Sequence, residues 1–227
     1  VLFRSLHKKH STKMSLDHVS LTIRRGEILG IAGVEGNGQK ELAEVITGIR
    51  RIKSGQMEYQ GKDIRKDSVK ERFRAGISYI SDDRHGDSLV MDMTVEDNLI
   101  LRDFDREPFS RKMVLDYRQA EKRAREALDE YSIKTSGKSG IKTPVKLMSG
   151  GNQQKVILSR EISGEADLIV ASQPTRGLDI GATRFVHETL LRQRDAGRCV
   201  LLISADLDEI LGVSDRVAVM YEGRRSE

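Results

Sequence analysis

Proline, cysteine and aromatic residues are scarce in this chain, and it contains no long hydrophobic run. With 3 prolines in 227 residues, 37% hydrophobic and 33% charged residues, the composition is typical of a globular protein and argues against disorder. No apolar stretch approaches the roughly 18–20 residues that span a bilayer. Cys199 is the single cysteine, so no internal disulfide can form. This suits a reducing cytoplasm and predicts a small core residue.

The shortage of aromatic residues also argues against nucleic-acid binding. They make up 4% of the chain, and the net charge is only +4, with Lys and Arg alternating with Asp and Glu. Nucleic-acid interfaces need a basic surface, and single-strand binders need stacking platforms as well. We therefore expect no nucleic-acid partner. The length suffices for one large α/β domain or two small ones.

The two ends of the chain have an unusual composition. Residues 1–5, VLFRS, are encoded by GTG CTC TTC CGA TCT, the end of a common sequencing adapter, and residues 225–227, RSE, by the start of its reverse complement. We interpret both segments as scars of a truncated reading frame. The hypothesis predicts a folded domain over 6–224 and a native protein that continues in both directions. A natural locus encoding these ends would refute it.

The segment GVEGNGQKE, residues 33–41, nearly matches a phosphate-binding loop. The pattern is G-x-x-x-x-G-K-[ST], and Gly33 and Gly38 supply its frame. Gln39 and Lys40 then stand where lysine and a hydroxyl residue belong. An alternating and then apolar segment precedes the loop, with a turn at Arg25–Gly26, and an amphipathic helix follows it. Strand, glycine loop and helix is the context in which such a loop occurs.

The rest of the chain predicts a parallel sheet covered by helices. Residues 166–172 and 198–204 are continuous apolar runs typical of buried parallel strands, and a helical segment at 181–197 separates them. A hairpin is expected at 54–64. A charged amphipathic helix is expected at 113–131, with Val114, Tyr117, Ala120, Ala124 and Leu128 on one face.

A second anion-binding pattern lies at LMSGGNQQK, residues 147–155. Ser149, Gly150 and Gly151 come directly before a predicted helix. Exposed backbone amides at a helix N-terminus, a hydroxyl and close-approach glycines together favour an anion.

These motifs, in this order, resemble the nucleotide-binding domain of an ABC transporter over residues 12–224: P-loop, signature, Walker B strand, D-loop and switch strand. The resemblance implies an α/β P-loop NTPase (RecA-like) core, an antiparallel β-subdomain and a helical signature subdomain at about 84–163. GVEGNGQ, SGGNQQK and QPTRGLDIGA resemble the second, C-terminal half of fused two-domain ATPases that power sugar and nucleoside uptake. DREPFSRKMVLDY is most similar to the nucleoside branch.

Carried over residue by residue, the resemblance implies that the catalytic groups are missing. The P-loop lysine falls on Gln39, and the magnesium-binding hydroxyl falls on Lys40, whose ammonium would repel the metal. The Walker B aspartate falls on Ser172 and the catalytic glutamate on Gln173, which cannot act as a base. The switch histidine falls on Ala205 and the Q-loop residue on Asp82. The nucleotide-binding positions would be Gly33, Gly36, Asn37, Gly38, Gln39, Lys40 and Glu41.

In this family two such domains pair head to tail, and each ATP lies between one P-loop and the other signature. The resemblance therefore implies a degenerate site at this chain's own P-loop. Ser149, Gly150, Gly151 and Asn152, with Asp179 of the D-loop, would complete the ATP site of a missing N-terminal half. Mg²⁺ is expected at that partner site and disfavoured at this one. The isolated chain, one part of a transport ATPase, should hydrolyse little or no ATP.

The implied partners are that N-terminal domain and a membrane permease, at the cytoplasmic face of the cell membrane. The permease's coupling helix would dock on residues 82–110, where Leu89, Val90, Met91 and Met93 are apolar. Three alternatives stay open: a monosaccharide importer of the ribose or galactose type, a regulatory module without hydrolysis, and an RNA-binding ABC protein. The last normally has a charged linker, which this sequence lacks.

The histidines predict no metal site, because none has ligand-spaced partners. His85 is interpreted as a loop residue beside the Q-loop position. His10 is a candidate for the slot where an aromatic residue stacks on adenine.

Overall fold

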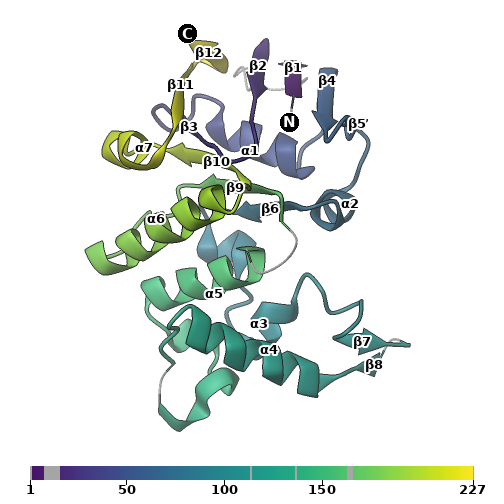
Figure 1. The fold of residues 1–227 in the computed structure, drawn as a ribbon, viewed down its shortest axis with the longest axis vertical. Helices are drawn as coiled ribbons and strands as arrows, with labels where there is room; N and C mark the ends of the chain where they lie inside the picture. The colour runs from purple at the N-terminus through teal and green to yellow at the C-terminus, as the bar shows by residue number, and fades with distance from the viewer. Residues whose placement is uncertain (1, 8–15, 113, 136, 163–165, 227) are drawn as a thin grey trace. The chain divides into compact units, whose positions relative to one another are not determined.

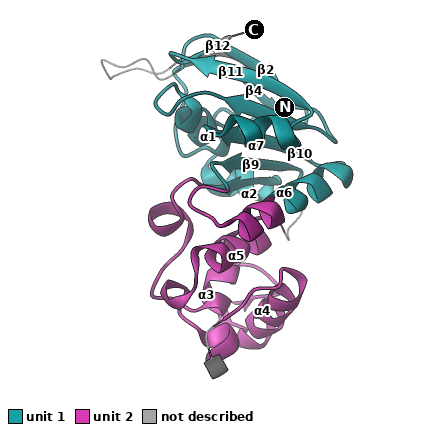
Figure 2. Cartoon of the chain, turned by 90° about the vertical axis from the view of Figure 1, so that its left-hand side faces the viewer, with its two compact units in different colours: residues 1–80, 165–174, 187–227 teal, residues 81–164, 175–186 magenta. Residues whose placement is uncertain are grey.

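The computed structural model describes residues 2–7, 16–112, 114–135, 137–162 and 166–226. The chain forms two compact units (Figure 2). The first comprises residues 1–80, 165–174 and 187–227, and the second residues 81–164 and 175–186. His10, Met113 and the terminal residues Val1 and Glu227 lie outside the described residues, so the adenine-stacking prediction for His10 stays a prediction.

A six-stranded sheet forms the centre of the first unit, in the order β12-β11-β3-β10-β9-β6 (Figure 1). Its strands are β3 (Ile28–Ala32), β6 (Ile77–Ile80), β9 (Leu168–Ser172), β10 (Cys199–Ser204), β11 (Arg216–Tyr221) and β12 (Arg224–Ser226). All neighbours pair in parallel except β11 and β12. Every residue of β3, β9 and β10 is buried, which explains why their sequences are continuously apolar. The predicted α/β class is confirmed.

An antiparallel sheet lies in the same unit, in the order β2-β1-β4-β5. Its strands are β1 (Leu2–His7), β2 (Val19–Thr22), β4 (Ser54–Tyr59) and β5 (Lys62–Asp63), so the predicted hairpin at 54–64 is confirmed. One hydrophobic core joins side chains of this sheet, of α1 and of the parallel sheet, including Leu21, Met57, Ile46 and Ile31. Residues 2–5 thus belong to a strand, and their interpretation as an adapter scar stays a prediction about their origin.

The described residues of the first unit include α1 (Gln39–Thr47), α2 (Val69–Arg74), the C-terminal part of α6 (Ile180–Asp195) and α7 (Leu207–Val213). Gly30 of β3 lets α7 approach closely, because a Cβ there would lie 2.3 Å from the Ser214 hydroxyl. His187 of α6 bonds through Nε2 to Glu209 of α7 at 2.9 Å, which ties the two helices together.

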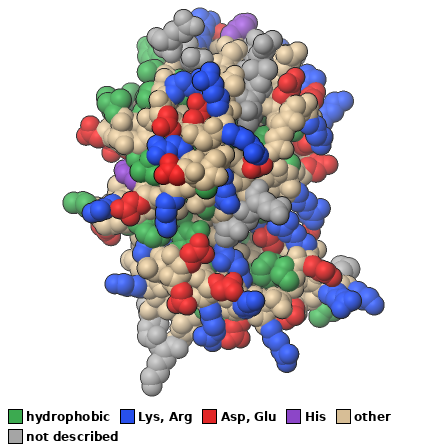
Figure 3. Space-filling view, in the orientation of Figure 1, with side chains coloured by type: hydrophobic (Ala, Val, Ile, Leu, Met, Phe, Trp, Pro, Cys, Tyr) green, Lys and Arg blue, Asp and Glu red, His purple; other side chains and the backbone are tan. Residues whose placement is uncertain are grey.

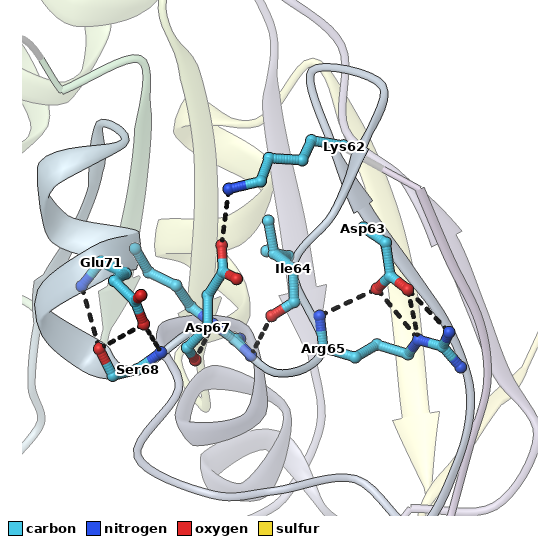
Figure 4. A network of polar contacts seen from close by, with 8 residues as sticks. Lys62, Asp63, Ile64, Arg65, Asp67, Ser68 and Glu71 are labelled. Carbon is cyan, nitrogen blue, oxygen red and sulfur yellow. Dashed lines mark hydrogen bonds and ion pairs between the residues drawn. The ribbon is translucent and has the colours of Figure 1, made fainter.

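A buried arginine joins α2 to α1. Ser68 and Glu71 form a capping box at the start of α2, in which Ser68 N donates to the Glu71 carboxylate at 2.7 Å (Figure 4). The next residue, Arg72, is 3% exposed, and its Nη1 donates to the carbonyls of Val45 (2.6 Å) and Ile46 (2.9 Å) in the last turn of α1. Its Nη2 donates to Ile64 O at 2.7 Å. Arg72 therefore caps α1 at its C-terminal end.

The second unit is mainly helical. It contains α3 (Val95–Ile100), α4 (Tyr117–Glu130), α5 (Gly150–Ile162), the start of α6 and a small hairpin of β7 (Ser110–Arg111) and β8 (Val114–Leu115). Three short turns, η1 (Arg84–Ser88), η2 (Gly137–Lys142) and η3 (Val145–Leu147), connect them.

The helix expected at 113–131 begins later than predicted. Val114 belongs to β8, and α4 starts at Tyr117 because the Asp116 side chain accepts from Arg118 N and caps it. Val114 and Tyr117 are 70% and 55% exposed, so neither lies on the buried face. Ala120, Ala124 and Ala127 form that face. The apolar periodicity continued into the hairpin, which is why sequence alone placed the start too early.

Candidate functional sites

The glycine loop connects β3 to α1 as the sequence predicts. Gly36 and Gly38 have φ of 90° and 99°, left-handed values that favour glycine, and α1 begins directly afterwards at Gln39. The N-cap residue of α1 is Gly38, which has no side chain to accept from the first amides of the helix. The predicted strand, loop and helix are therefore all present.

Gln39 is packed inside the loop. Its side chain is 6% exposed, and its Nε2 donates to Val34 O at 3.1 Å. A Cβ on Gly33 would lie 2.6 Å from that same nitrogen, so glycine is needed where the amide passes. The Gln39 Oε1 is buried and has no hydrogen-bond partner. A neutral amide is thus buried at the position that the sequence analysis assigned to the P-loop lysine.

Asn37 locks the loop to the turn between β11 and β12. Its Nδ2 donates to Val34 O at 2.9 Å, its Oδ1 accepts from Glu222 N at 2.9 Å, and its carbonyl accepts from Gly223 N at 3.0 Å. Lys40 is exposed on the next step of α1, turned away from the side on which Gln39 is buried. Asn37 and Gln39 therefore both donate to the Val34 carbonyl, and residues 33–39 of the loop contain no ammonium group.

The ends of β9 and β10 lie at the same sheet edge as the loop. In the parallel register Ser204 is level with Ala32, the residue before the loop, and Ser172 is level with Ile203. Ser172 is 3% exposed, and Gln173 adopts a left-handed φ of 47° while its N donates to Ile203 O at 2.8 Å. Ala205 is exposed at the end of β10. The structure thus brings the P-loop, Walker B and switch positions together in the first unit.

This edge does not fit a magnesium ion. The positions that would ligate the metal are Lys40 and Ser172, an ammonium and a neutral hydroxyl, and Mg²⁺ prefers carboxylates and other oxygen ligands. The described residues contain no group of three or more His, Cys, Asp or Glu side chains able to hold a metal. Asp82, the Q-loop position, is half-buried and belongs to the second unit.

The signature residues form the start of α5 in the second unit. Ser149 is exposed, and its Oγ accepts from Asn152 Nδ2 at 2.9 Å. Asn152 Oδ1 in turn accepts from Lys134 N at 2.8 Å. Gly150 and Gly151 are the first residues of the helix, so their amides have no acceptor within it. The predicted arrangement of a hydroxyl and glycines at a helix N-terminus is confirmed.

Asp179 lies beside this helix start. Its Oδ1 accepts from Ala182 N at 2.8 Å and caps the first turn of α6. A Cβ on Gly151 would lie 2.9 Å from the Ala182 Cβ, so only glycine allows α5 and α6 to approach this closely. Gly151 thus has a packing role in addition to offering an amide.

His85 is a structural residue, as the sequence interpretation expected. Its Nε2 bonds to Gln153 Oε1 at 3.0 Å, and Gln153 Nε2 donates to Val145 O at 3.0 Å. The neighbouring Arg84 was missed by sequence reasoning, because DDRHG offered no pattern that distinguishes one arginine from the surface arginines. The structure places Arg84 next to Gly150.

The fold is that of an ATP-binding cassette. A nucleotide-free ATP-binding cassette from an ABC transporter superposes with a TM-score of 0.84, covering 100% of this chain and 89% of the other at 23% identity. A dimeric cassette bound to ADP and Pi gives 0.81, covering 100% and 96% at 19% identity. The ABC transporter family model matches residues 16–176. The chain belongs to the ABC transporter family, whose ATPase domains bind ATP with Mg²⁺.

Curated relatives include importers of nucleosides and sugars. The chain is 46% identical over 206 residues to the guanosine import ATP-binding protein NupO of Bacillus subtilis. It is 41% identical over 217 residues to the nucleoside import ATP-binding protein NupA of Lactococcus lactis, and 37% identical over 224 residues to a ribose import ATP-binding protein of Clostridium perfringens. These matches cover 91%, 96% and 96% of this chain but only 40%, 42% and 43% of the relatives, so the chain spans about two-fifths of their length.

Within the part of the chain that the structure describes, every helix is too short or too polar to cross a bilayer.

Proposed function

We propose that this chain is the signature-donating half of a fused importer ATPase. Its domain spans 6–224, and its own P-loop site does not support turnover. Ser149, Gly150 and Gly151 complete the ATP site of an N-terminal half in the same native protein. Mg²⁺ binds with ATP at that site, where the other half supplies the metal ligands.

The observation that carries this proposal is the contrast between the two motifs. At the loop, a neutral amide is buried in the lysine position and its nitrogen is bonded to Val34 O. Gln173 stands where the base belongs, and an amide cannot accept a proton from the attacking water. The signature, in contrast, keeps the Ser149 hydroxyl and both glycines at the start of α5. Asp179, which caps the neighbouring helix α6, is kept as well. The chain thus lacks the cation and the base of a P-loop site, while it retains the anion-binding groups of a signature.

We propose nucleosides as the transported class. The relatives of 46% and 41% identity are named for guanosine and nucleoside import, and the ribose importer is less similar at 37%. Since an ATPase domain does not contact the transported molecule, a monosaccharide importer is the alternative. Uptake of labelled guanosine and ribose by cells that express the full-length subunit with its cognate permease would separate the two. If the chain is instead part of a regulatory module, the assembled full-length complex should show no ATPase activity.

The proposed partner at the membrane is a permease, with the chain bound peripherally at the cytoplasmic face. The docking surface predicted at 82–110 needs one correction. Leu89 is 5% exposed and belongs to the core, whereas Val90 and Met93 are 42% and 43% exposed. The run of apolar residues did not reveal which of them points outward.

A charge at Val90 should therefore uncouple transport. We expect Val90→Asp or Met93→Asp to lower nucleoside uptake by at least about tenfold, because a buried interfacial charge without a partner costs several kcal/mol. Subunit stability should be unchanged. Leu89→Asp should instead prevent folding. Uptake assays and thermal melts of purified subunits check this, and wild-type uptake by both exposed variants would refute the assignment.

The isolated chain gives a direct test of the degenerate site. Because backbone amides at the start of α1 persist without a lysine, we expect ATP affinity no better than roughly 10⁻⁴ M, with little dependence on Mg²⁺ and no measurable turnover. Isothermal titration with and without Mg²⁺ measures the ATP affinity, and phosphate release under the same conditions measures turnover. Rapid Mg²⁺-dependent hydrolysis by this chain alone would contradict the proposal.

A further inference from the structure

An arginine without a carboxylate partner lies beside the signature. Arg84 is half-buried, and among the described residues its side chain donates one hydrogen bond, from Nη1 to the carbonyl of Arg176 at 2.7 Å. No carboxylate of the described residues forms an ion pair with it, in contrast to the buried Arg160, which pairs with Glu161 at 2.9 Å. Burial lowers the pKa of the Arg84 guanidinium, and no anion opposes that effect.

The guanidinium points toward the signature glycines. A Cβ built on Gly150 would lie 3.7 Å from Arg84 Nη2, and one built on Gly177 would lie 3.5 Å from the same nitrogen. All of these residues belong to the second unit, so their spacing is set within one compact body. Arg84 has five N–H donors and uses one of them on Arg176. The remaining donors are sufficient for a bidentate contact with an oxyanion.

Local structure fixes Arg84 in this position. The turn η1 begins after Asp83, whose Oδ1 accepts from His85 N at 3.1 Å and Gly86 N at 2.8 Å. His85 then bonds to Gln153, which lies in the first turn of α5. The same turn that holds Arg84 is therefore attached to the helix whose N-terminus carries the signature. Such placement costs little further side-chain entropy on binding a ligand.

We propose that Arg84 is the signature-side cation for the γ-phosphate of the ATP bound by the other half. The proposal rests on the function proposed above and adds a residue to it. The amides of Gly150 and Gly151 and the Ser149 hydroxyl offer only dipoles, whereas Arg84 adds a full positive charge that phosphate oxygens accept in a forked geometry. Arg84 therefore adds positive charge to the ATP site of the other half and leaves this chain's own P-loop site unchanged.

The test compares Arg84→Gln, Arg84→Lys and Arg118→Gln in the full-length subunit assembled with its permease. Arg118 is an exposed arginine of the same unit and is the matched control. We expect Arg84→Gln to lower kcat by about 10²-fold, similar to the loss of one transition-state donor. Affinity for ATP should fall while affinity for ADP stays unchanged, because ADP has no γ-phosphate. Arg118→Gln should behave as the wild type.

Lysine at position 84 separates phosphate contact from a purely structural role. A lysine can still donate to the Arg176 carbonyl, so a structural tie predicts full recovery in Arg84→Lys. A bidentate phosphate contact predicts only partial recovery. Arg84→Gln with wild-type kcat and ATP affinity, or full recovery in Arg84→Lys, overturns the proposal. Ser149→Arg, measured alongside, distinguishes a failure of the proposed signature role from a failure of the Arg84 proposal. If Ser149→Arg is inactive and Arg84→Gln is normal, only the Arg84 proposal fails.

Discussion

Replacing Ser149 with arginine is expected to reduce ATP hydrolysis by the assembled full-length subunit to near background. The serine is exposed at the start of α5, one residue before the helical amides of Gly150 and Gly151. An arginine side chain there would occupy the space into which the other half's ATP must fit. Gly150→Asp should be as damaging, because a carboxylate at this helix start repels phosphate. We expect a loss of at least about 10³-fold in each case.

A matched control is available in the same unit. Val114→Arg adds the same side chain at a 70% exposed position of the β7–β8 hairpin, and its ATPase activity should equal that of the wild type. Size-exclusion chromatography of the complexes would show that all variants assemble. Normal hydrolysis by a fully assembled Ser149→Arg complex would refute the signature role.

Removing the buried guanidinium of Arg72 is expected to destabilise the first unit strongly. Arg72→Met removes the charged donors of the Val45, Ile46 and Ile64 carbonyls. Val45 O keeps the Gly48 amide at 3.3 Å and Ile64 O keeps the Asp67 amide at 3.1 Å, whereas Ile46 O loses its Arg72 donor. An unpaired buried acceptor costs about 1–3 kcal/mol, and a hydrogen bond to a charged donor contributes about 1.5–3 kcal/mol. Because these losses are not additive, we expect a total loss of about 3–5 kcal/mol. Urea unfolding followed by circular dichroism measures the change.

Arg74 on the same helix provides the comparison. It is exposed, so Arg74→Met should change stability by less than about 1 kcal/mol. Amide exchange supplies a local readout, because protection in the last turn of α1 should fall in Arg72→Met and persist in Arg74→Met. Equal stability of the two variants would show that Arg72 does not cap α1.

Sequence patterns predicted most of the first unit, because its signals are local. The apolar runs of β9 and β10 are buried on both faces, and the glycine frame of residues 33–38 needs left-handed backbone at Gly36 and Gly38. Such features follow from periodicity and from backbone sterics alone.

The features that sequence missed depend on contacts between distant segments. Arg72 is separated from Val45 by 27 residues, and Arg84 from Arg176 by 92. The chain contains 39 Lys and Arg residues, so the sequence does not distinguish a buried or functional arginine from those on the surface. Figure 3 shows basic and acidic side chains interspersed over the face in view. The burial of Leu89 next to the exposed Val90 was also missed, because it too depends on how distant segments pack together.

At the loop, sequence identified the substitution and the structure added its physical consequence. Gln39 could be recognised as a residue in the lysine position, but its bond to Val34 O and the tie from Asn37 to Glu222 were not predictable from spacing. Because the Gln39 amide donates to the Val34 carbonyl, restoring a lysine at position 39 would also remove this bond. The substitution at position 39 is therefore accompanied by contacts of its own, which a single reversion to lysine would not preserve.

The most direct test of the central claim compares Gln173→Ala with Ser149→Arg in one assembled complex. The account predicts that Gln173→Ala retains ATP hydrolysis within about twofold of the wild type, because its site does not turn over, while Ser149→Arg is inactive. A catalytic residue at position 173 would make the same change cost about 10²–10⁴-fold. If Gln173→Ala loses as much activity as Ser149→Arg, this chain's own P-loop site is catalytic and the account is wrong.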